Sequence, residues 1–195
     1  MNYLAHLYLS GNNTQIIIGN FIADHLKGSL RNSYDGEILT GIKLHHFIDG
    51  FTDSHPVVEQ TKSRLRQHFH KYTPVVVDVY YDHFLANNWQ NYHQQTLADY
   101  VHDVYLLLDE NKTQLPQRTN YMLGYMKQEN WLAGYKHFEN LDRIFRNMSR
   151  RTKYENNMQD AVEFLQRDYE LIQKDFELFF EELKSSCANF LENQG

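Results

Sequence analysis

The chain has 195 residues, 42% of them hydrophobic and 14% aromatic, which suffices for one globular domain with a substantial core and excludes intrinsic disorder. Its single cysteine, Cys187, excludes an internal disulfide, a zinc finger and a cysteine-ligated iron–sulfur cluster. The formal net charge of −6 gathers toward the C-terminal end, where residues 155–195 carry three Lys or Arg against ten Asp or Glu, so broad nucleic-acid binding is disfavoured.

The first segment, MNYLAHLYLSGNNTQIIIGNFIADHLKG, has no basic start, and Asn, Gln, Asp and His interrupt its apolar residues. Neither a signal peptide nor a membrane span is predicted, and we expect a cytoplasmic protein. Only three prolines and nine glycines occur, and the alternation typical of strands is scarce. We therefore predict a single all-helical domain over residues 1–195, with helices near 2–9, 14–27, 35–52, 56–71, 75–90, 95–110, 118–132, 135–150 and 156–191.

Two prolines and one long periodic segment support these boundaries. Pro56 and Pro74 each follow a short polar stretch, and proline is tolerated in the first turn of a helix because its missing N–H has no partner there. From Met158 to Phe190, apolar residues recur every three or four positions between acidic and polar ones. We expect this helix to close a bundle with one buried face, on which Cys187 lies, rather than to form a coiled coil with a partner.

Aspartates and histidines lie within four apolar segments, where they are costly to bury. They are His6, Asp24, His45, Asp49, Asp78, Asp82 and His83. His45 and Asp49 are four residues apart in GIKLHHFIDGFTDSHP, so a helix places them on one face. Asp78 and Asp82 have the same spacing in DVYYDHF, and His83 follows about 100° further round the helix.

Imidazole nitrogen combined with carboxylate oxygen suits a divalent cation such as Mn²⁺, Fe²⁺, Zn²⁺ or Mg²⁺. A cation would also offset the repulsion between crowded carboxylates. Four of these residues have a structural alternative: a hydrogen-bonded core histidine for His6, a helix cap for Asp49, and a solvated face for Asp78 and Asp82. The sequence contains no GxGxxG or Walker loop and no GxSxG motif, so a phosphate cradle or a serine nucleophile is not indicated.

With these segments in view, the sequence resembles the acyl carrier protein phosphodiesterase family. The likeness lies in MNYLAHLYLS, GNFIADHLKG, GIKLHHFIDGFTDSHPVV and VVVDVYYDHFLANNW, and continues more weakly into NYMLGYMKQENWLAGY and NMSRR. The resemblance implies an all-helical fold distantly like the HD-domain phosphohydrolases. It also implies a metal-dependent hydrolysis that removes 4′-phosphopantetheine from holo acyl carrier protein, with Mn²⁺ as the usual cation and Mg²⁺ or Fe²⁺ as alternatives.

Residue by residue, the resemblance assigns a metal-binding set and a catalytic set. The metal-binding set is Asp24, His45, Asp49, Asp78, Asp82 and His83. The catalytic set is His6, Asp24 and His83, with His6 or His83 as donor of the leaving-group proton if it is not a ligand. One position departs from the family pattern: His46 stands where many members carry Arg, which bears on how phosphate is held.

The implied partner, a small acidic carrier protein, requires a basic docking face. In the N-terminal part the candidates are Lys43 and Arg64, together with Lys27, Arg31, Lys62 and Arg66. Arg150 and Arg151, in RIFRNMSRRTK, form an alternative patch for phosphate or an acidic partner, although they also suit a helix C-terminus.

Two other hypotheses remain open at this point. One is an HD-type metal phosphohydrolase that acts on a nucleotide or another small phosphodiester. The other is a non-catalytic helical binding protein in which the Asp and His residues are structural.

Overall fold

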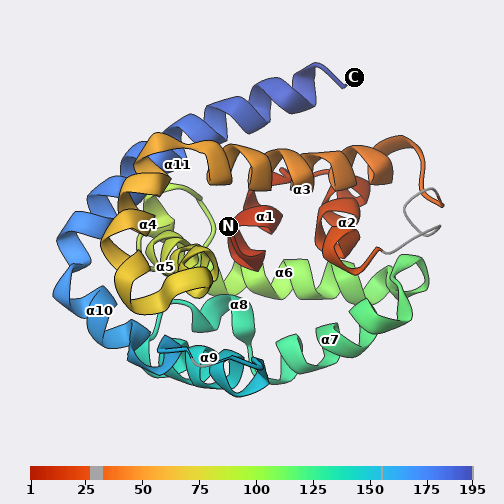
Figure 1. Cartoon of the computed structure of the whole chain (residues 1–195). Helices are drawn as coiled ribbons and strands as arrows, with labels where there is room; N and C mark the ends of the chain where they lie inside the picture. The colour runs from red at the N-terminus through yellow and green to blue at the C-terminus, as the bar shows by residue number, and fades with distance from the viewer. Residues whose placement is uncertain (27–32, 155, 195) are drawn as a thin grey trace.

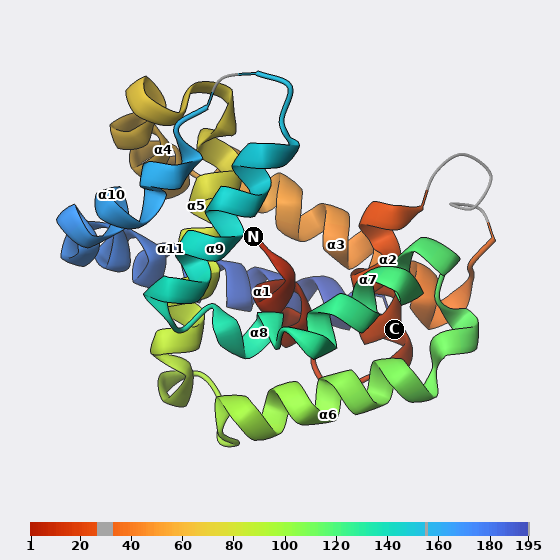
Figure 2. The ribbon, with the colours of Figure 1, turned by 90° about the horizontal axis from the view of Figure 1, so that it is seen from below.

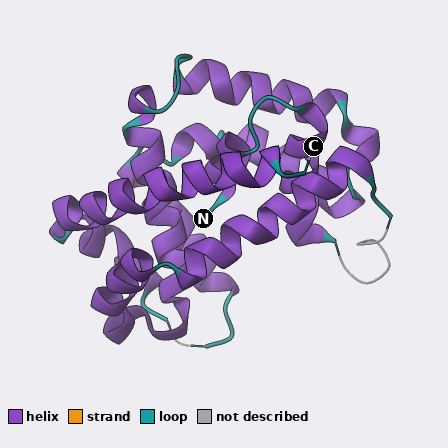
Figure 3. Ribbon diagram, turned by 90° about the horizontal axis from the view of Figure 1, so that it is seen from above, coloured by secondary structure: helices purple, strands orange, loops and turns teal. Residues whose placement is uncertain are grey.

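The computed structural model describes residues 1–26, 33–154 and 156–194. Within these ranges every regular element is a helix (Figure 3), which confirms the predicted all-helical fold. The α-helices are α1 (Tyr3–Leu9), α2 (Thr14–Ile22), α3 (Gly36–Ser54), α4 (Pro56–Phe69), α5 (Thr73–Asn87), α6 (Leu97–Glu110), α7 (Gln117–Gln128), α8 (Trp131–Gly134), α9 (Phe138–Arg151), α10 (Ala161–Arg167) and α11 (Tyr169–Glu192). Short 3₁₀ turns are η1 (Ala23–His25), η3 (His70–Tyr72), η4 (Trp89–Asn91), η5 (Lys112–Gln114) and η6 (Met158–Asp160).

Local sequence signals account for most helix boundaries, with two exceptions. Pro56 occupies the first turn of α4 after an extended His55, as predicted. The helix predicted over 118–132 is instead divided into α7 and α8, because Asn130 adopts a left-handed conformation with φ 47° that asparagine tolerates better than most residues. The helix predicted over 156–191 is interrupted at Asp168, whose φ of −108° and ψ of 21° are not helical.

Helix α1 lies at the centre of the molecule (Figure 1). It packs against α2 and α5, while α11 packs along α3 and α4. Seen from below, α7, α8 and α9 lie together beside α1 (Figure 2). None of the described helices combines the length and the apolar character that a bilayer crossing requires.

Aromatic side chains of α5 and α11 fill the core between these helices. Tyr81 and Phe84 of α5 contact Phe176 and Phe179 of α11, and all four are fully buried. Burying each side chain of this size contributes about 1.5–3 kcal/mol. Cys187 is buried on the same helix, which raises the pKa of its thiol to about 12, so it serves packing as expected.

A polar cluster joins α4, α5 and α11 inside this packing. The buried carboxylate of Asp175 accepts a hydrogen bond from the Thr61 hydroxyl at 2.7 Å and pairs with the guanidinium of Arg64. The hydroxyls of Thr61 and Tyr81 lie 3.0 Å apart. Because every polar group in this cluster has a partner, its burial is compatible with a stable core.

Two glycines bring α2 and α3 into backbone contact. A Cβ atom on Gly41 would overlap the carbonyl oxygen of Ile16 and lie 2.8 Å from the amide nitrogen of Asn20. A Cβ atom on Gly19 would overlap the carbonyl of Ile38 in the same way. Only glycine permits this approach, which places α2 directly against the N-terminal third of α3.

Candidate active site

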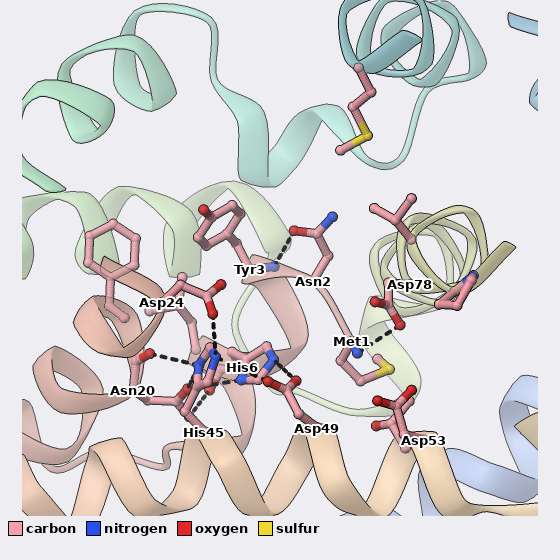
Figure 4. A pocket seen from close by; sticks show the side chains of 16 residues that line it. Met1, Asn2, Tyr3, His6, Asn20, Asp24, His45, Asp49, Asp53 and Asp78 are labelled. Carbon is pink, nitrogen blue, oxygen red and sulfur yellow. Dashed lines mark hydrogen bonds and ion pairs between the residues drawn. The ribbon is translucent and has the colours of Figure 1, made fainter. Parts of the chain in front are cut away.

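A cavity of about 400 Å³ lies where α1, α2, α3 and α5 meet (Figure 4). Its polar lining includes Asn2, His6, Asn20, Asp24, His45, Asp49, Asp53 and Asp78, and Met1, Pro74, Val75 and Met148 supply apolar wall. The sequence prediction placed five of these residues in one site, namely His6, Asp24, His45, Asp49 and Asp78. The fold brings all five to one cavity from four different elements.

His6, His45 and Asp49 form a compact cluster in the cavity floor. The Nε2 atom of His45 lies 3.2 Å from Asp49 Oδ2, and the Nε2 atom of His6 lies 3.2 Å from Asp49 Oδ1. The two imidazole rings stack with their centroids 4.2 Å apart. Asp24 joins from η1, with Oδ1 3.1 Å from His45 Nε2. The three cluster residues offer donor atoms that all lie within 4.8 Å of one another.

Asn20 orients both histidines, and the sequence analysis did not identify it. Its Nδ2 donates to the carbonyl oxygen of His6 and to the hydroxyl of Ser10, each at 2.9 Å. A carbonyl only accepts, so the side-chain oxygen of Asn20 must face the two rings. That oxygen lies 2.9 Å from Nδ1 of His6 and 3.0 Å from Nδ1 of His45. We infer that both Nδ1 atoms carry a proton and donate it to Asn20, which leaves both Nε2 atoms directed at carboxylates.

The protonation of the two rings follows from their surroundings. Burial lowers the pKa of His6 and outweighs the hydrogen bond that a protonated ring would donate to Asp49, so His6 is neutral at pH 7. Burial also opposes protonation of His45, but hydrogen bonds to Asp24 and Asp49 outweigh it and raise the pKa of His45 to about 9. The pKa of Asp24 is lowered by its hydrogen bond to His45. Burial would raise the pKa of Asp49, but the hydrogen bond from the protonated His45 outweighs it and lowers that pKa.

A neutral His6 with its proton on Nδ1 turns a lone pair toward Asp49 Oδ1 at 3.2 Å, so two acceptors face each other. A cation between them removes that repulsion. Ligands about 2.1 Å from a cation and 90° apart lie roughly 3 Å from each other. The distances of 3.2 Å from the Nε2 atoms of His6 and His45 to the oxygens of Asp49 are close to this value. The donor set of two imidazoles and a carboxylate therefore fits a divalent metal and leaves positions for water and substrate.

The charge of the cavity leads to the same conclusion. Among the described residues, four carboxylates line it, from Asp24, Asp49, Asp53 and Asp78, against two lining cations, the N-terminal ammonium of Met1 and the imidazolium of His45. A phosphodiester is an anion and would be repelled by this lining. A bound divalent cation would offset that charge.

The α5 residues predicted as metal ligands are placed differently. Asp78 borders the cavity but forms an ion pair at 2.9 Å with the N-terminal ammonium. Asp82 is completely buried and accepts hydrogen bonds from the backbone N–H of Asn2 at 3.2 Å and of Leu4 at 2.7 Å. Burial raises the pKa of Asp82 to about 7. Its oxygens thus hold the start of α1 in place instead of joining the cluster.

His83 points away from the cluster, because consecutive helical residues diverge by about 100°. Its Nδ1 lies 2.8 Å from the carbonyl oxygen of Tyr135, and its Nε2 lies 3.2 Å from the hydroxyl of Tyr169. It does not line the cavity, and it does not belong to the group of possible metal ligands among the described residues. We therefore correct the assignment of Asp82 and His83: the fold gives both a structural position.

The basic residues predicted to bind phosphate or a partner are scattered. Lys43 is exposed on α3, whereas Arg64 is committed to the buried Asp175. Arg150 and Arg151 are exposed at the end of α9. Two further candidates, Lys27 and Arg31, lie outside the described residues. His46 is exposed on α3, and its ring meets that of His45 edge-on with centroids 5.7 Å apart.

Comparison with known proteins addresses identity. Residues 1–183 match the family model described as acyl carrier protein phosphodiesterase. The chain belongs to this family. A protein of Pectobacterium atrosepticum named acyl carrier protein phosphodiesterase is 32% identical over 150 residues, which cover 76% of this chain and 78% of the relative. Relatives of the same name come from Photorhabdus laumondii, at 25% identity over 190 residues (97% and 96% of the two chains), and Yersinia pestis, at 30% over 152 residues (77% and 79%).

The match confirms the resemblance noted in the sequence. The chain is an enzyme of the phosphodiesterase class, so the hypothesis of a non-catalytic binding protein is not retained. No solved structure matches the chain, and the likeness to HD-domain phosphohydrolases stays a prediction.

Proposed function

We propose that the protein is a metal-dependent phosphodiesterase that hydrolyses 4′-phosphopantetheine from holo acyl carrier protein in the cytoplasm. The names of its relatives support the carrier protein as substrate. One observation carries the metal dependence: His6 and His45 turn their Nε2 atoms toward Asp49 in an acidic cavity. Products are apo carrier protein and free phosphopantetheine.

His6, His45 and Asp49 hold the cation in this proposal. Their mixture of nitrogen and oxygen donors suits Mn²⁺, with Mg²⁺ or Fe²⁺ as alternatives. When bound, a divalent cation supplies Lewis-acid stabilisation of phosphate charge and lowers the pKa of water. Asn20 keeps both imidazoles in the tautomer that a ligand requires.

Asp24 is the general base in this proposal. Its side chain is 62% exposed, faces the cavity, and lies 3.1 Å from His45 Nε2. It is positioned to orient the attacking water and to accept its proton. As the water oxygen bonds to phosphorus, the bond between phosphorus and the serine oxygen of the carrier breaks, and the serine oxygen takes up a proton from solvent water. Because His83 is buried against Tyr135 and Tyr169, it is no longer proposed as the donor.

The test is a mass-spectrometric assay of holo acyl carrier protein incubated with the purified protein and Mn²⁺. We expect loss of the phosphopantetheine mass, abolished by a chelator, by Asp24→Ala and by His45→Ala. The matched control is His83→Gln, which alters a histidine outside the cavity and should retain turnover if folded. An unchanged carrier mass with folded, metal-loaded wild-type protein would refute the proposal. A screen of nucleotides and small phosphodiesters would then test the remaining alternative.

A further inference from the structure

A second and larger cavity adjoins the candidate active site. It measures about 640 Å³ and is lined by residues from the start of α1 and from helices α7, α8 and α9. These helices lie together in Figure 2. Asn2, Tyr3 and Met148 line both cavities. A molecule seated in the second cavity therefore reaches the wall of the first.

Three arginines line this second cavity. Arg118 lies on α7, and Arg143 and Arg151 lie on α9. All three are exposed, and within the part of the chain that the structure describes none has a carboxylate ion-pair partner. Arg143 donates one hydrogen bond to the side-chain oxygen of Asn140 at 3.2 Å. Exposed arginines without an internal carboxylate partner keep their guanidinium groups available for carboxylates from outside.

Aromatic side chains accompany the arginines. Tyr121 is 69% exposed and Tyr125 43% exposed on α7, and both line the cavity with Trp131. Among the residues that the structure describes, one carboxylate lines the cavity, that of Glu129, which accepts a hydrogen bond from Trp131 Nε1 at 3.1 Å. Tyr, Trp and Arg are the residues enriched at the centres of protein interfaces.

The distribution of charge along the chain distinguishes this surface from the rest. Residues 117–153 contain eight Lys or Arg and three Asp or Glu. Residues 76–116 contain one against six, and residues 155–195 three against ten. The three basic residues of α4 that the sequence suggested as docking groups are each paired with an acidic side chain, Lys62 with Asp53, Arg64 with Asp175 and Arg66 with Glu59.

We infer that the cavity between α7, α8 and α9 is the docking site for an acidic surface of the protein substrate. This inference rests on the proposed function, because it places the phosphodiester of that partner at the His6–His45–Asp49 cluster. Charge complementarity favours an acidic protein over the pantetheine arm, which has no charge beyond its phosphate. Tyr121 and Tyr125 also present an exposed aromatic surface, which suits a protein partner and is not needed to bind a small anion.

The test compares Arg118→Glu/Arg143→Glu with wild-type protein on holo acyl carrier protein over a range of salt concentrations. We expect kcat/KM to fall roughly 10- to 100-fold at low ionic strength, with kcat close to that of wild type. The difference should shrink in about 1 M salt, where the Debye length is near 3 Å. Lys174→Glu makes the same charge change as each single arginine substitution, at an exposed residue of α11 that lines neither cavity, and should change kcat/KM less than twofold. Matching thermal melts exclude misfolding.

Two further measurements separate this inference from its alternatives. A phosphopantetheinyl-seryl peptide without acidic residues should be hydrolysed equally by wild type and the double variant. If the double variant lost as much activity on the peptide as on the carrier protein, the inference would be overturned, and the cavity would be assigned to binding of the prosthetic group. Loss of protein turnover in Lys43→Glu but not in the arginine variant would overturn it in favour of α3.

Fluorescence anisotropy with labelled carrier protein tests docking without turnover. Wild-type protein should bind it, in apo and holo form, and the double variant should bind at least tenfold more weakly. If wild type binds but releases no phosphopantetheine, the proposed function fails while docking stands. If wild type and variant bind equally, docking fails whatever the turnover.

Discussion

Asn20 is the residue whose loss most directly tests the reasoning about the site. Asn20→Ala removes the acceptor of both Nδ1–H groups and leaves the buried Nδ1–H of His6 without a partner. His45 keeps the backbone carbonyl of Asn20 at 3.0 Å, and the carbonyl of His6 keeps the Ser10 hydroxyl at 2.8 Å. One orphaned buried donor costs about 1–3 kcal/mol. With the small void added, we expect the free energy of unfolding to fall by about 2–4 kcal/mol.

The second expected effect is on the metal. Groups that orient ligating histidines typically change metal affinity by about 10- to 100-fold. Urea melts with a chelator report the loss of stability, and titration with Mn²⁺ followed by thermal melts reports the affinity. Saturation at about 100 times the dissociation constant stabilises wild type by about 2.7 kcal/mol. In a chain of this length that corresponds to roughly 5–10 °C.

Ser10→Ala is the matched control. It removes a buried hydroxyl from the same network but leaves both contacts between the imidazoles and the Asn20 oxygen. We expect a stability loss of about 1 kcal/mol and an Mn²⁺ affinity within about twofold of wild type. If Asn20→Ala lost stability as calculated yet bound Mn²⁺ like wild type, Asn20 would be a packing residue only and the tautomer argument would be refuted.

Three other predictions test parts of the fold. Gly41→Ala should lower the free energy of unfolding by about 3 kcal/mol because α2 and α3 must separate. Gly50→Ala on the same helix, where a Cβ meets open space, should raise it by about 0.5–1 kcal/mol. Equal effects of the two substitutions in urea melts would contradict the close packing. Arg64→Ala should lower the free energy of unfolding by about 3–5 kcal/mol because the buried carboxylate of Asp175 loses its cationic partner, while the KM for carrier protein stays unchanged. A raised KM at unaltered stability would instead indicate that Arg64 contacts the carrier protein. Since the pKa of Asp82 is about 7 when folded and about 4 when unfolded, the neutral carboxyl stabilises the fold below pH 4, and this contribution is lost as pH rises through 7. Asp82→Asn should flatten the decline in unfolding free energy between about pH 4 and 7, and a slope equal to that of wild type would argue against a buried, titrating carboxyl.

Local rules were enough to predict most helices and part of the site. Apolar spacing of three and four residues identified α11, and prolines located the starts of α4 and α5. The pair His45 and Asp49 was predicted from helical spacing, and the two side chains do lie 3.2 Å apart. These features depend on neighbours within one or two turns, which a sequence displays directly.

The remaining assignments depended on contacts between distant segments. Helical spacing could not show that Asp82 turns to the backbone of Asn2 and Leu4, about 80 residues earlier. Nor could it show that Arg64 meets Asp175, which is 111 residues later. The sequence did not indicate the role of Asn20, because an uncharged amide within IIIGNFI does not by itself predict a catalytic or ligand-orienting residue. Its position amid apolar residues was the available signal, since a buried amide needs partners.

The backbone contact at Gly19 and Gly41 has a consequence for how the site responds to its ligand. Asn20 follows one of these glycines and His45 lies one turn beyond the other, so the ring and its acceptor are positioned by main chain rather than by flexible side chains. Main chain locked in two packed helices has already lost its conformational entropy when the protein folds. In the proposed metal site, an incoming cation would therefore need to order little beyond its own waters. In such a site, part of the metal affinity would be set when the protein folds. A substitution that loosens the packing of α2 against α3 would then weaken metal binding although every ligand residue is unchanged.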